Sequence, residues 1–430
     1  MRILVIGSGG REHAILGTLA RTSRQPLHLY CAPGNGGIAQ VAECVPVPVG
    51  DHAGLIEFVR SHQIDLTIVG PEGPLAEGIV DEFEKSGLQI VGPTRAASRL
   101  ESSKVFAKDF MLRHGIPTAD YVAASSPAEA LSALGSGRFG PPESPVVVKA
   151  DGLAAGKGVV VAASRAEAER AVGELASGSL VPSEAAKQIL IEEALQGREV
   201  SVLLFADGRD YALMPPARDH KRVGENDTGP NTGGMGAITD ASILDTETLA
   251  RIENTVVQPT LNGALAEGFP FRGVLFIGLM LTAGGPKVLE YNVRFGDPET
   301  QAILVRLKSD LSQVFQALAA GELSSVIVEW SQESSACVVL ASGGYPGAYP
   351  SGLPITGLEP AAANRNGVQV FHAGTSISPA GGFETAGGRV LGVTATGATL
   401  KAALDRCYAA VKEIGWEGMQ YRRDIGRFTG

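Results

Sequence analysis

The residues whose types and spacing offer the most chemistry lie in segment 289–300, which reads LEYNVRFGDPET. Side chains of an extended strand alternate between its two faces, so Glu290, Asn292 and Arg294 share one face. A carboxylate, an amide and a guanidinium in a row suit a bound metal ion and phosphate groups, because Mg²⁺ prefers oxygen ligands and arginine binds phosphate oxygens. A salt-bridged edge strand is the alternative interpretation.

A second segment, 149–158, reads KADGLAAGKG and separates two apolar runs, 146–148 and 159–161. The pattern predicts a strand, a glycine-rich loop and a returning strand, which together form a hairpin-like flap. No GxxxxGK[ST] motif is present here, which disfavours a Walker-type nucleotide site. A glycine loop with flanking Lys149 and Lys157 suits a lid over the β- and γ-phosphates of a nucleotide. A solvated glycine hairpin is the alternative.

A third segment, GSGGRE at residues 7–12, follows an apolar run and opens a helical pattern. Glycines at the amino end of a helix let backbone N–H groups approach an anion, and the helix dipole favours negative charge there. Arg11 strengthens the case for a phosphate. Glu12 stands where the third glycine of a dinucleotide fingerprint belongs, which disfavours a nicotinamide dehydrogenase. A plain tight turn is the alternative.

Two further polar segments complete the set. Segment 191–199 (IEEALQGRE) has a strand edge that suits an adenine, followed by Glu199, whose carboxylate suits a ribose diol; exposed acidic residues near a strand end explain it equally well. Residues 219–222 (DHKR) lead into segment 226–236 (NDTGPNTGGMG), which has almost no aliphatic side chains. Such a loop cannot form a core, and long polar loops inside a domain are usually functional.

Composition limits the class of protein. The chain has 430 residues with 44% hydrophobic and 19% charged residues, which is typical of a globular protein. A net charge of −10 disfavours nucleic-acid binding. The four cysteines form no CxxC pair and no run approaches the roughly 18 apolar residues of a membrane span. We therefore expect a cytoplasmic protein with free thiols and neither nucleic-acid nor membrane partners.

The elements that must position these segments fall into four expected domains, all α/β or α+β. Apolar runs alternating with helical stretches predict a parallel sheet for the amino-terminal domain. One of its helices is expected over residues 76–85. The expected domains are an amino-terminal α/β domain at 1–120, a small α+β lid domain at 121–190, a central domain at 191–332 and a carboxy-terminal α+β domain at 333–430.

Taken together and in this order, the segments resemble the ATP-grasp superfamily. The resemblance is more specific for five sequences that are similar to the phosphoribosylamine–glycine ligase family, also called glycinamide ribonucleotide synthetases. These are GSGGREHA at 7–14, KADGLAAGKG at 149–158, GPNTGGMG at 229–236, RFGDPETQ at 294–301 and YRRDIG at 421–426.

The resemblance implies an ATP-grasp core with a small mobile lid domain and a reaction in de novo purine biosynthesis. In that reaction ATP, glycine and 5-phosphoribosylamine become glycinamide ribonucleotide, ADP and phosphate through glycyl phosphate. It also implies Mg²⁺ or Mn²⁺ as cofactor, small molecules as the partners, and a monomer or weak dimer.

The resemblance carries the family's roles onto this chain residue by residue. The implied ATP-binding residues are Lys104, Lys149, Gly156, Lys157, Gly158, Glu192, Glu193, Ala194, Leu195 and Glu199. The implied metal ligands are Glu290 and Asn292. The implied substrate-binding residues are Gly9, Gly10, Arg11, Glu12, Asp219, Asn231, Thr232, Gly233, Gly234, Met235, Gly236 and Arg294. The implied catalytic residues are Arg294, Lys221 and Asp219.

One departure from the superfamily leaves the number of metal ions open. Many members supply another acidic ligand from the preceding strand, and residues 276–280 (FIGLM) contain none. Two rival functions also stay open at this stage. Another ATP-grasp carboxylate–amine ligase, such as a purine-pathway carboxylase or a D-alanine ligase, would not need the 9–12 segment. A non-catalytic nucleotide-binding protein would not need the Glu290, Asn292 and Arg294 face.

Overall fold

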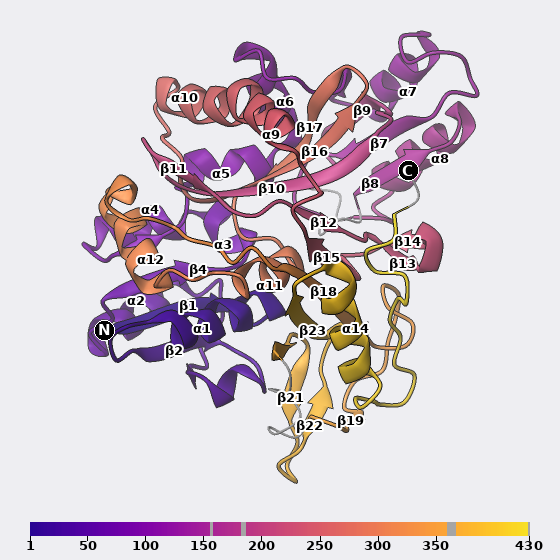
Figure 1. The fold of residues 1–430 in the computed structure, drawn as a ribbon. Coiled ribbons are helices and arrows are strands. Elements are labelled where there is room, and N and C mark those ends of the chain that lie inside the picture. Colours follow the sequence, from indigo (N-terminus) through magenta and orange to yellow (C-terminus); the bar gives the residue numbers. More distant parts are fainter. Residues whose placement is uncertain (155–157, 182–185, 359–366, 429–430) are drawn as a thin grey trace.

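The amino-terminal domain is built on a parallel sheet, as its alternating pattern predicts. The computed structural model describes residues 1–154, 158–181, 186–358 and 367–428. Five parallel strands follow the order β3-β2-β1-β4-β5, and their apolar side chains are buried under helices on both faces (Figure 1). The strands are β1 (Arg2–Gly7), β2 (His28–Pro33), β3 (Glu43–Cys44), β4 (Leu66–Val69) and β5 (Ile90–Val91).

One helix predicted for this domain differs in the structure. The helix expected over residues 76–85 is wrong, because Gly78 divides it into α3 and α4. Gly78 has φ +92° and its N–H donates to the carbonyls of Pro74 and Leu75, so it closes α3 in a conformation that favours glycine. The helices are α1 (Gly10–Thr22), α2 (His52–Ser61), α3 (Glu72–Glu77), α4 (Ile79–Lys85), α5 (Arg95–Ser102) and α6 (Lys104–Arg113).

A separate small domain carries the glycine-rich segment. Its four antiparallel strands run in the order β6-β9-β7-β8. Lys149 pairs with Val159 across β7 and β8, so the predicted hairpin is confirmed. Two helices cover this sheet, on the upper right of Figure 1. The elements are β6 (Tyr121–Ala124), α7 (Pro127–Gly135), β7 (Val146–Ala150), β8 (Val159–Ala162), α8 (Arg165–Ala176) and β9 (Ile189–Glu193).

The central and carboxy-terminal parts share one large sheet. Its strands follow the path β17-β16-β10-β12-β15-β18-β23-β20, with β11 paired to β10. The two parts join where β15 pairs with β18. The strands are β10 (Arg198–Asp207), β11 (Tyr211–Leu213), β12 (Ala217–Asp219), β15 (Gly236–Thr239), β16 (Arg272–Thr282), β17 (Gly285–Asn292), β18 (Ser334–Ala341), β20 (Val368–His372) and β23 (Arg389–Gly397).

Helices and two small sheets surround this large sheet. The hairpin β13–β14 contains residues 226–231 of the expected polar loop, and the last four of these form strand β14. The helices are α9 (Thr246–Ile252), a π-helical turn (Glu253–Val257), α10 (Gln258–Ala266), α11 (Glu299–Leu304), α12 (Leu311–Ala320) and α14 (Leu400–Val411). The remaining strands are β13 (Arg222–Gly224), β14 (Thr228–Asn231), β19 (Pro354–Ile355), β21 (Thr375–Ile377) and β22 (Phe383–Thr385). None of the helices in the described ranges is long and apolar enough to span a membrane.

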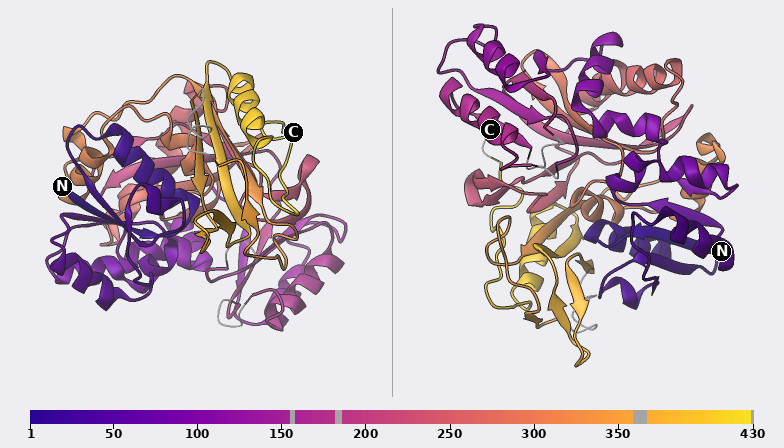
Figure 2. Two further views of the ribbon diagram at one scale, coloured as in Figure 1. Left: turned by 90° about the horizontal axis from the view of Figure 1, so that it is seen from below. Right: turned by 180° about the vertical axis from the view of Figure 1, so that it is seen from behind.

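The first and last domains lie against each other, as Figure 2 shows for the indigo and yellow segments. His13 on α1 makes the contact: its Nδ1 accepts the backbone N–H of His372 at 2.9 Å, and its ring packs edge-on to Phe371. Burial, with a smaller effect from His372, lowers the pKa of His13 to about 3. His13, the last polar residue of the GSGGREHA sequence, is therefore neutral and joins the two domains.

Candidate active site

Three adjoining cavities meet at the end of β17. Their volumes are about 100, 430 and 350 Å³, and Glu290 lines all three. Tyr291 and Val293 are only 2% and 1% exposed and pack in the core, although Tyr291 also forms part of the wall of the small cavity, whereas Asn292 and Arg294 present polar groups to the cavities. The alternation of β17 therefore directs one polar face into the cavities, as the sequence predicts.

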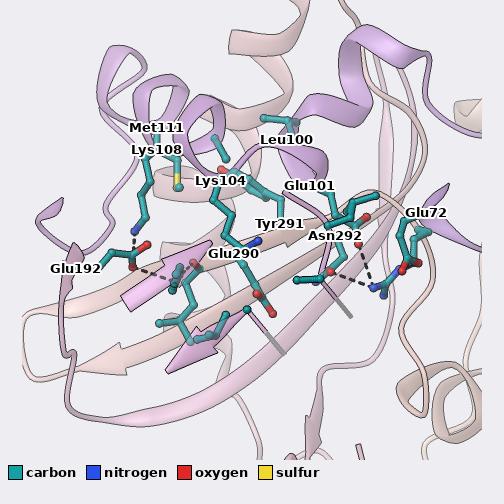
Figure 3. Close-up of a pocket in the computed structure, with 18 residues that line it drawn as sticks. Glu72, Leu100, Glu101, Lys104, Lys108, Met111, Glu192, Glu290, Tyr291 and Asn292 are labelled. Atoms are coloured by element: carbon teal, nitrogen blue, oxygen red, sulfur yellow. Dashed lines mark hydrogen bonds and ion pairs between the residues drawn. The ribbon is translucent and has the colours of Figure 1, made fainter. Parts of the chain in front are cut away.

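A buried cluster of two lysines and one glutamate lies beside this face. Glu192 Oε2 is 2.9 Å from Lys149 Nζ and 3.1 Å from Lys108 Nζ (Figure 3). Burial opposes ionisation of Glu192, but the two ammonium groups outweigh it and lower the pKa of the carboxyl. Burial lowers the pKa of Lys108 to about 8 despite Glu192. The cluster places the Lys149 ammonium at the wall between the small and the large cavity.

Lys108 is a site residue that the sequence reasoning missed. It lies four residues after Lys104 on α6, among the apolar residues of that helix, and is 2% exposed. A lysine on an apolar helix face is the signal that points to it. Lys104 itself reaches the start of the glycine-rich segment, where its Nζ donates to the carbonyls of Asp151 and Gly152.

The glycine-rich loop is only partly described. The predicted ATP-binding residues Gly156 and Lys157 lie outside the described residues. Gly158 lines the small cavity, and a side chain there would meet Ala154 and Ala150 at 2.8 and 3.3 Å. Glycine at this position therefore lets the two ends of the loop approach each other.

Arg294 is held by two carboxylates of the amino-terminal domain. Its Nε lies 3.1 Å from Glu72 Oε2, and its Nη2 lies 3.1 Å from Glu101 Oε1. The same Nη2 donates to Asn292 Oδ1 at 3.1 Å. Burial would lower the pKa of Arg294, but the two carboxylates raise it, so the guanidinium stays charged. No local sequence signal marks Glu72 or Glu101, because both reach the site from other elements.

Glu290 has the free oxygens that a metal ion needs. Within the described ranges its carboxylate makes no hydrogen bond and no ion pair, and Asn292 offers an amide oxygen two residues further on the same face. No group of three or more His, Cys, Asp or Glu residues placed to hold a metal occurs among the described residues. The pair therefore fits a Mg²⁺ ion that takes its other oxygens from a phosphate-bearing ligand and water.

The large cavity is lined by residues of segment 191–199, which the sequence predicts to contact an adenine and a ribose. Glu193, Ala194, Leu195 and Glu199 line it together with the apolar Val147, Val161, Met280 and Leu289. Glu193 is exposed and pairs with Lys287 at 3.3 Å. The apolar walls suit a planar base and the carboxylates suit hydroxyl groups.

The third cavity brings together about half of the predicted substrate residues. Lys221 Nζ lies 2.7 Å from Asp219 Oδ1 and 3.5 Å from Glu199 Oε2. Desolvation opposes ionisation of Lys221, but these carboxylates raise its pKa well above the usual value. The predicted residues that line this cavity are Arg11, Asp219, Lys221, Asn231, Thr232, Gly233, Glu290, Asn292 and Arg294.

The other predicted substrate residues do not line this cavity. They either support residues that line it or are buried in the core. Glu12 accepts the backbone N–H of Gly9 at 2.6 Å and pairs with Arg11 Nε at 2.6 Å, which aims Arg11 at the cavity. Gly10 is buried against Gln301. Gly234 packs on Pro298, and Met235 and Gly236 are buried in or beside β15.

Besides Glu72, three charged residues absent from the predicted set line the same cavity: Asp297, Glu299 and Arg389. Burial, with a smaller effect from Asp219, raises the pKa of Glu299 to about 7. Arg389 of β23 pairs with Asp297 Oδ2 at 3.3 Å and donates to the carbonyl of Asp297. The first two stand in the RFGDPETQ sequence, which points to them, whereas no sequence signal marks Arg389.

These features define the class of protein. A cavity of nucleotide size lies between a small antiparallel domain and a large sheet, and it is lined by lysines and by a carboxylate that can bind a metal ion. This arrangement is that of an ATP-grasp site. Family models agree with this assignment. Residues 1–101, 102–300 and 335–428 match the N, ATP-grasp (A) and C domains described as phosphoribosylglycinamide synthetase. The chain therefore belongs to the phosphoribosylamine–glycine ligase family, and it is an ATP-dependent ligase.

Individual relatives support the assignment over the whole chain. A phosphoribosylamine–glycine ligase of Rhizobium meliloti is 46% identical over 99% of this chain and 98% of its own length. The solved phosphoribosylamine–glycine ligase of Thermotoga maritima is 35% identical, with a TM-score of 0.84 over 99% of this chain and 100% of that one. The trifunctional purine biosynthetic protein adenosine-3 of Gallus gallus is 49% identical over 99% of this chain, which spans 42% of that relative. A Campylobacter jejuni biotin carboxylase shares the fold, with a TM-score of 0.72 at 17% identity.

Proposed function

We propose that this chain joins glycine to 5-phosphoribosylamine and produces glycinamide ribonucleotide, ADP and phosphate. The observation that carries the proposal is the position of Glu290, which lines the nucleotide-sized cavity and the arginine-containing third cavity at once. A phosphoryl group held at this point is accessible from both sides. The names of the full-length relatives supply the identity of the two substrates.

The large cavity is assigned to the adenosine part of ATP. Its apolar walls would sandwich the base, and Glu199 would accept the ribose hydroxyls. Lys104 and Lys149, at the inner end, would bind phosphate oxygens. The third cavity is assigned to phosphoribosylamine and glycine, with Arg11 as its main cationic side chain on the amino-terminal side.

Glu290 and Asn292 would hold Mg²⁺ or Mn²⁺ against the phosphates. A divalent ion there supplies positive charge that stabilises the oxygens around the transferred phosphorus. Arg294, fixed by Glu72 and Glu101, would stabilise the same charge from the protein side.

The chemistry takes two displacements. A carboxylate oxygen of glycine attacks the γ-phosphorus of ATP, the bond to the bridging oxygen of ADP breaks, and glycyl phosphate forms. The amine nitrogen of phosphoribosylamine then attacks the acyl carbon, phosphate leaves with the C–O bonding pair, and the nitrogen loses one proton. No protein nucleophile is needed, so positioning and charge stabilisation by Lys221, Asp219 and Arg294 would carry the catalysis.

The test is phosphate release from ATP and Mg²⁺, with glycine and freshly prepared phosphoribosylamine added singly and together. Release only with both substrates, and one glycinamide ribonucleotide per phosphate, is the expected result. Release with a different acid or amine would keep the ATP-grasp chemistry and overturn the substrates. ATP binding without turnover for any pair would favour a binding protein.

A further inference from the structure

The carboxy-terminal segment 421–428 (YRRDIGRF, hereafter the tail) contributes to the nucleotide cavity although it lies about 130 residues after Glu290 in the chain. Its last described residue, Phe428, lines the large cavity together with Glu199 and Arg218. None of the roles assigned above uses the tail. Its contacts with β12 and the β13–β14 hairpin show what it does there.

The tail is anchored by a buried arginine. Arg422 is 1% exposed, and its guanidinium pairs with Asp424 and with Asp227 at 2.8 Å each. It also donates to the carbonyl of Arg222 at 3.0 Å. Because Asp227 and Arg222 belong to the β13–β14 hairpin and its loop, these bonds fix the tail to that hairpin.

The end of the tail is fixed by His220. The backbone N–H of Gly426 donates to His220 Nε2 at 2.9 Å, and the ring of Phe428 stacks on the His220 ring with centroids 4.3 Å apart and planes 12° apart. Burial, followed by the nearby Arg422, lowers the pKa of His220 to about 4, so the stacked imidazole is neutral at pH 7. Phe428 therefore has a defined orientation at the cavity wall.

Arg218 lies against the other face of the Phe428 ring. The guanidinium carbon of Arg218 lies 3.5 Å from the ring centroid. Within the described ranges Arg218 makes no hydrogen bond and no ion pair, and its Nε is buried without a partner. Burial, followed by Arg198, lowers the pKa of Arg218 to about 10, which still leaves it charged at pH 7. A half-buried, charged group that has a buried donor without a partner at a cavity wall is costly unless a ligand pairs with it.

We propose that Arg218, positioned over the ring of Phe428 of the tail, is a nucleotide-binding residue whose N–H groups bond acceptor oxygens on the sugar–phosphate part of the nucleotide. A guanidinium that covers an aromatic face leaves its N–H donors free for a ligand, and Arg218 lines the large cavity. Arg218 lines the cavity that contains Ala194 and Glu199 and not the one that contains Arg11 and Thr232. The nucleotide, and not phosphoribosylamine, is therefore its ligand. The inference rests on the proposed function.

The test is calorimetric binding of ADP with Mg²⁺ to the full chain. R218Q and F428A are each expected to raise the Kd for ADP about tenfold or more, as the loss of a hydrogen bond from a charged donor predicts. The double variant is expected to have a Kd for ADP no more than about twofold above that of R218Q, since Phe428 acts through Arg218. The KM for glycine is expected to stay within about twofold of the wild-type value.

Matched controls separate this role from general disruption of the tail. R427A removes the exposed guanidinium next to Phe428 and is expected to bind ADP like the wild type. R218Q covers the case in which F428A does not fold, because it leaves the tail intact. Wild-type affinity in R218Q, or an equal loss in R427A, would overturn the inference. Failure of the wild type to bind ADP would instead overturn the proposed function.

Discussion

Glu101 Oε1 lies 3.1 Å from Arg294 Nη2, while Glu101 Oε2 accepts the backbone N–H of Val293 at 2.7 Å. One buried carboxylate on α5 of the amino-terminal domain thus fixes both the backbone and the side chain at the end of β17. Burial raises the pKa of Glu101 to about 6, although Arg294 opposes this. The domain that carries the GSGGREHA sequence therefore also orients the arginine assigned to the transferred phosphoryl group.

The first prediction concerns this contact. E101Q keeps an acceptor for Val293 but removes the charge that holds Arg294, so kcat should fall about 10- to 100-fold while the Kd for ADP stays within about twofold. Steady-state kinetics and ADP calorimetry check it. E72Q, which removes the partner on the other side of the guanidinium, is expected to have a smaller effect, since Glu72 is half-buried. An unchanged kcat in E101Q would show that Arg294 is positioned without Glu101.

The second prediction concerns the buried cluster of Glu192, Lys108 and Lys149. E192Q leaves two buried ammonium groups without a carboxylate, so it should lower the free energy of unfolding by about 3 kcal/mol or more. Urea unfolding measures this value. The adjacent E193Q is the matched control: Glu193 forms an exposed pair with Lys287, and losing such a pair costs about 1 kcal/mol or less. Equal losses in the two variants would contradict the argument.

Local pattern explains why part of this site was predictable. The alternation of Glu290, Asn292 and Arg294 needs only the geometry of one strand, and the β7–β8 hairpin needs only two apolar runs around glycines. Both were predicted, and the fold class followed from the order of such segments. Gly78 shows the limit of this reasoning, because an apolar pattern continues across the residue at which the chain turns.

The site residues that the sequence does not predict have a different property in common. Their role depends on contacts between elements that are distant in the sequence. Glu101 reaches Arg294 across 193 positions of sequence, and Lys108 meets Glu192 across 84. Arg389 and Phe428 come from the carboxy-terminal part. No spacing within a single element indicates such pairs, so only the packing of α5, α6, β23 and the tail on the central sheet identifies them.

The third prediction concerns the metal ligands. E290Q removes the negative charge from a carboxylate that has no partner among the residues the structure describes, so the Mg²⁺ concentration for half-maximal activity should rise about tenfold or more. A Mg²⁺ titration of phosphate release checks it. N292A, which removes an oxygen already engaged by Arg294, is expected to produce a smaller rise. A metal dependence unchanged in E290Q would exclude Glu290 as a ligand.

The fourth prediction concerns the contact between the first and last domains. His13 is neutral in the folded protein, with its pKa lowered to about 3 mainly by burial, whereas the unfolded chain binds a proton near pH 6.5. The unfolded state therefore binds more protons between these values, and stability is lost as the pH falls from 6.5 toward 3. The loss from His13 reaches roughly 2 kcal/mol at pH 5.

H13N tests the origin of this pH dependence, because asparagine offers a neutral acceptor for the backbone N–H of His372. Urea unfolding at pH 7, 6 and 5 should show a shallower loss of stability in H13N than in the wild type. The exposed His28 provides the control, and H28N should retain the wild-type slope. Because His372 is also buried with a pKa lowered to about 4, some pH dependence should remain in H13N. A slope identical in H13N and the wild type would show that His13 does not stay neutral in the folded state.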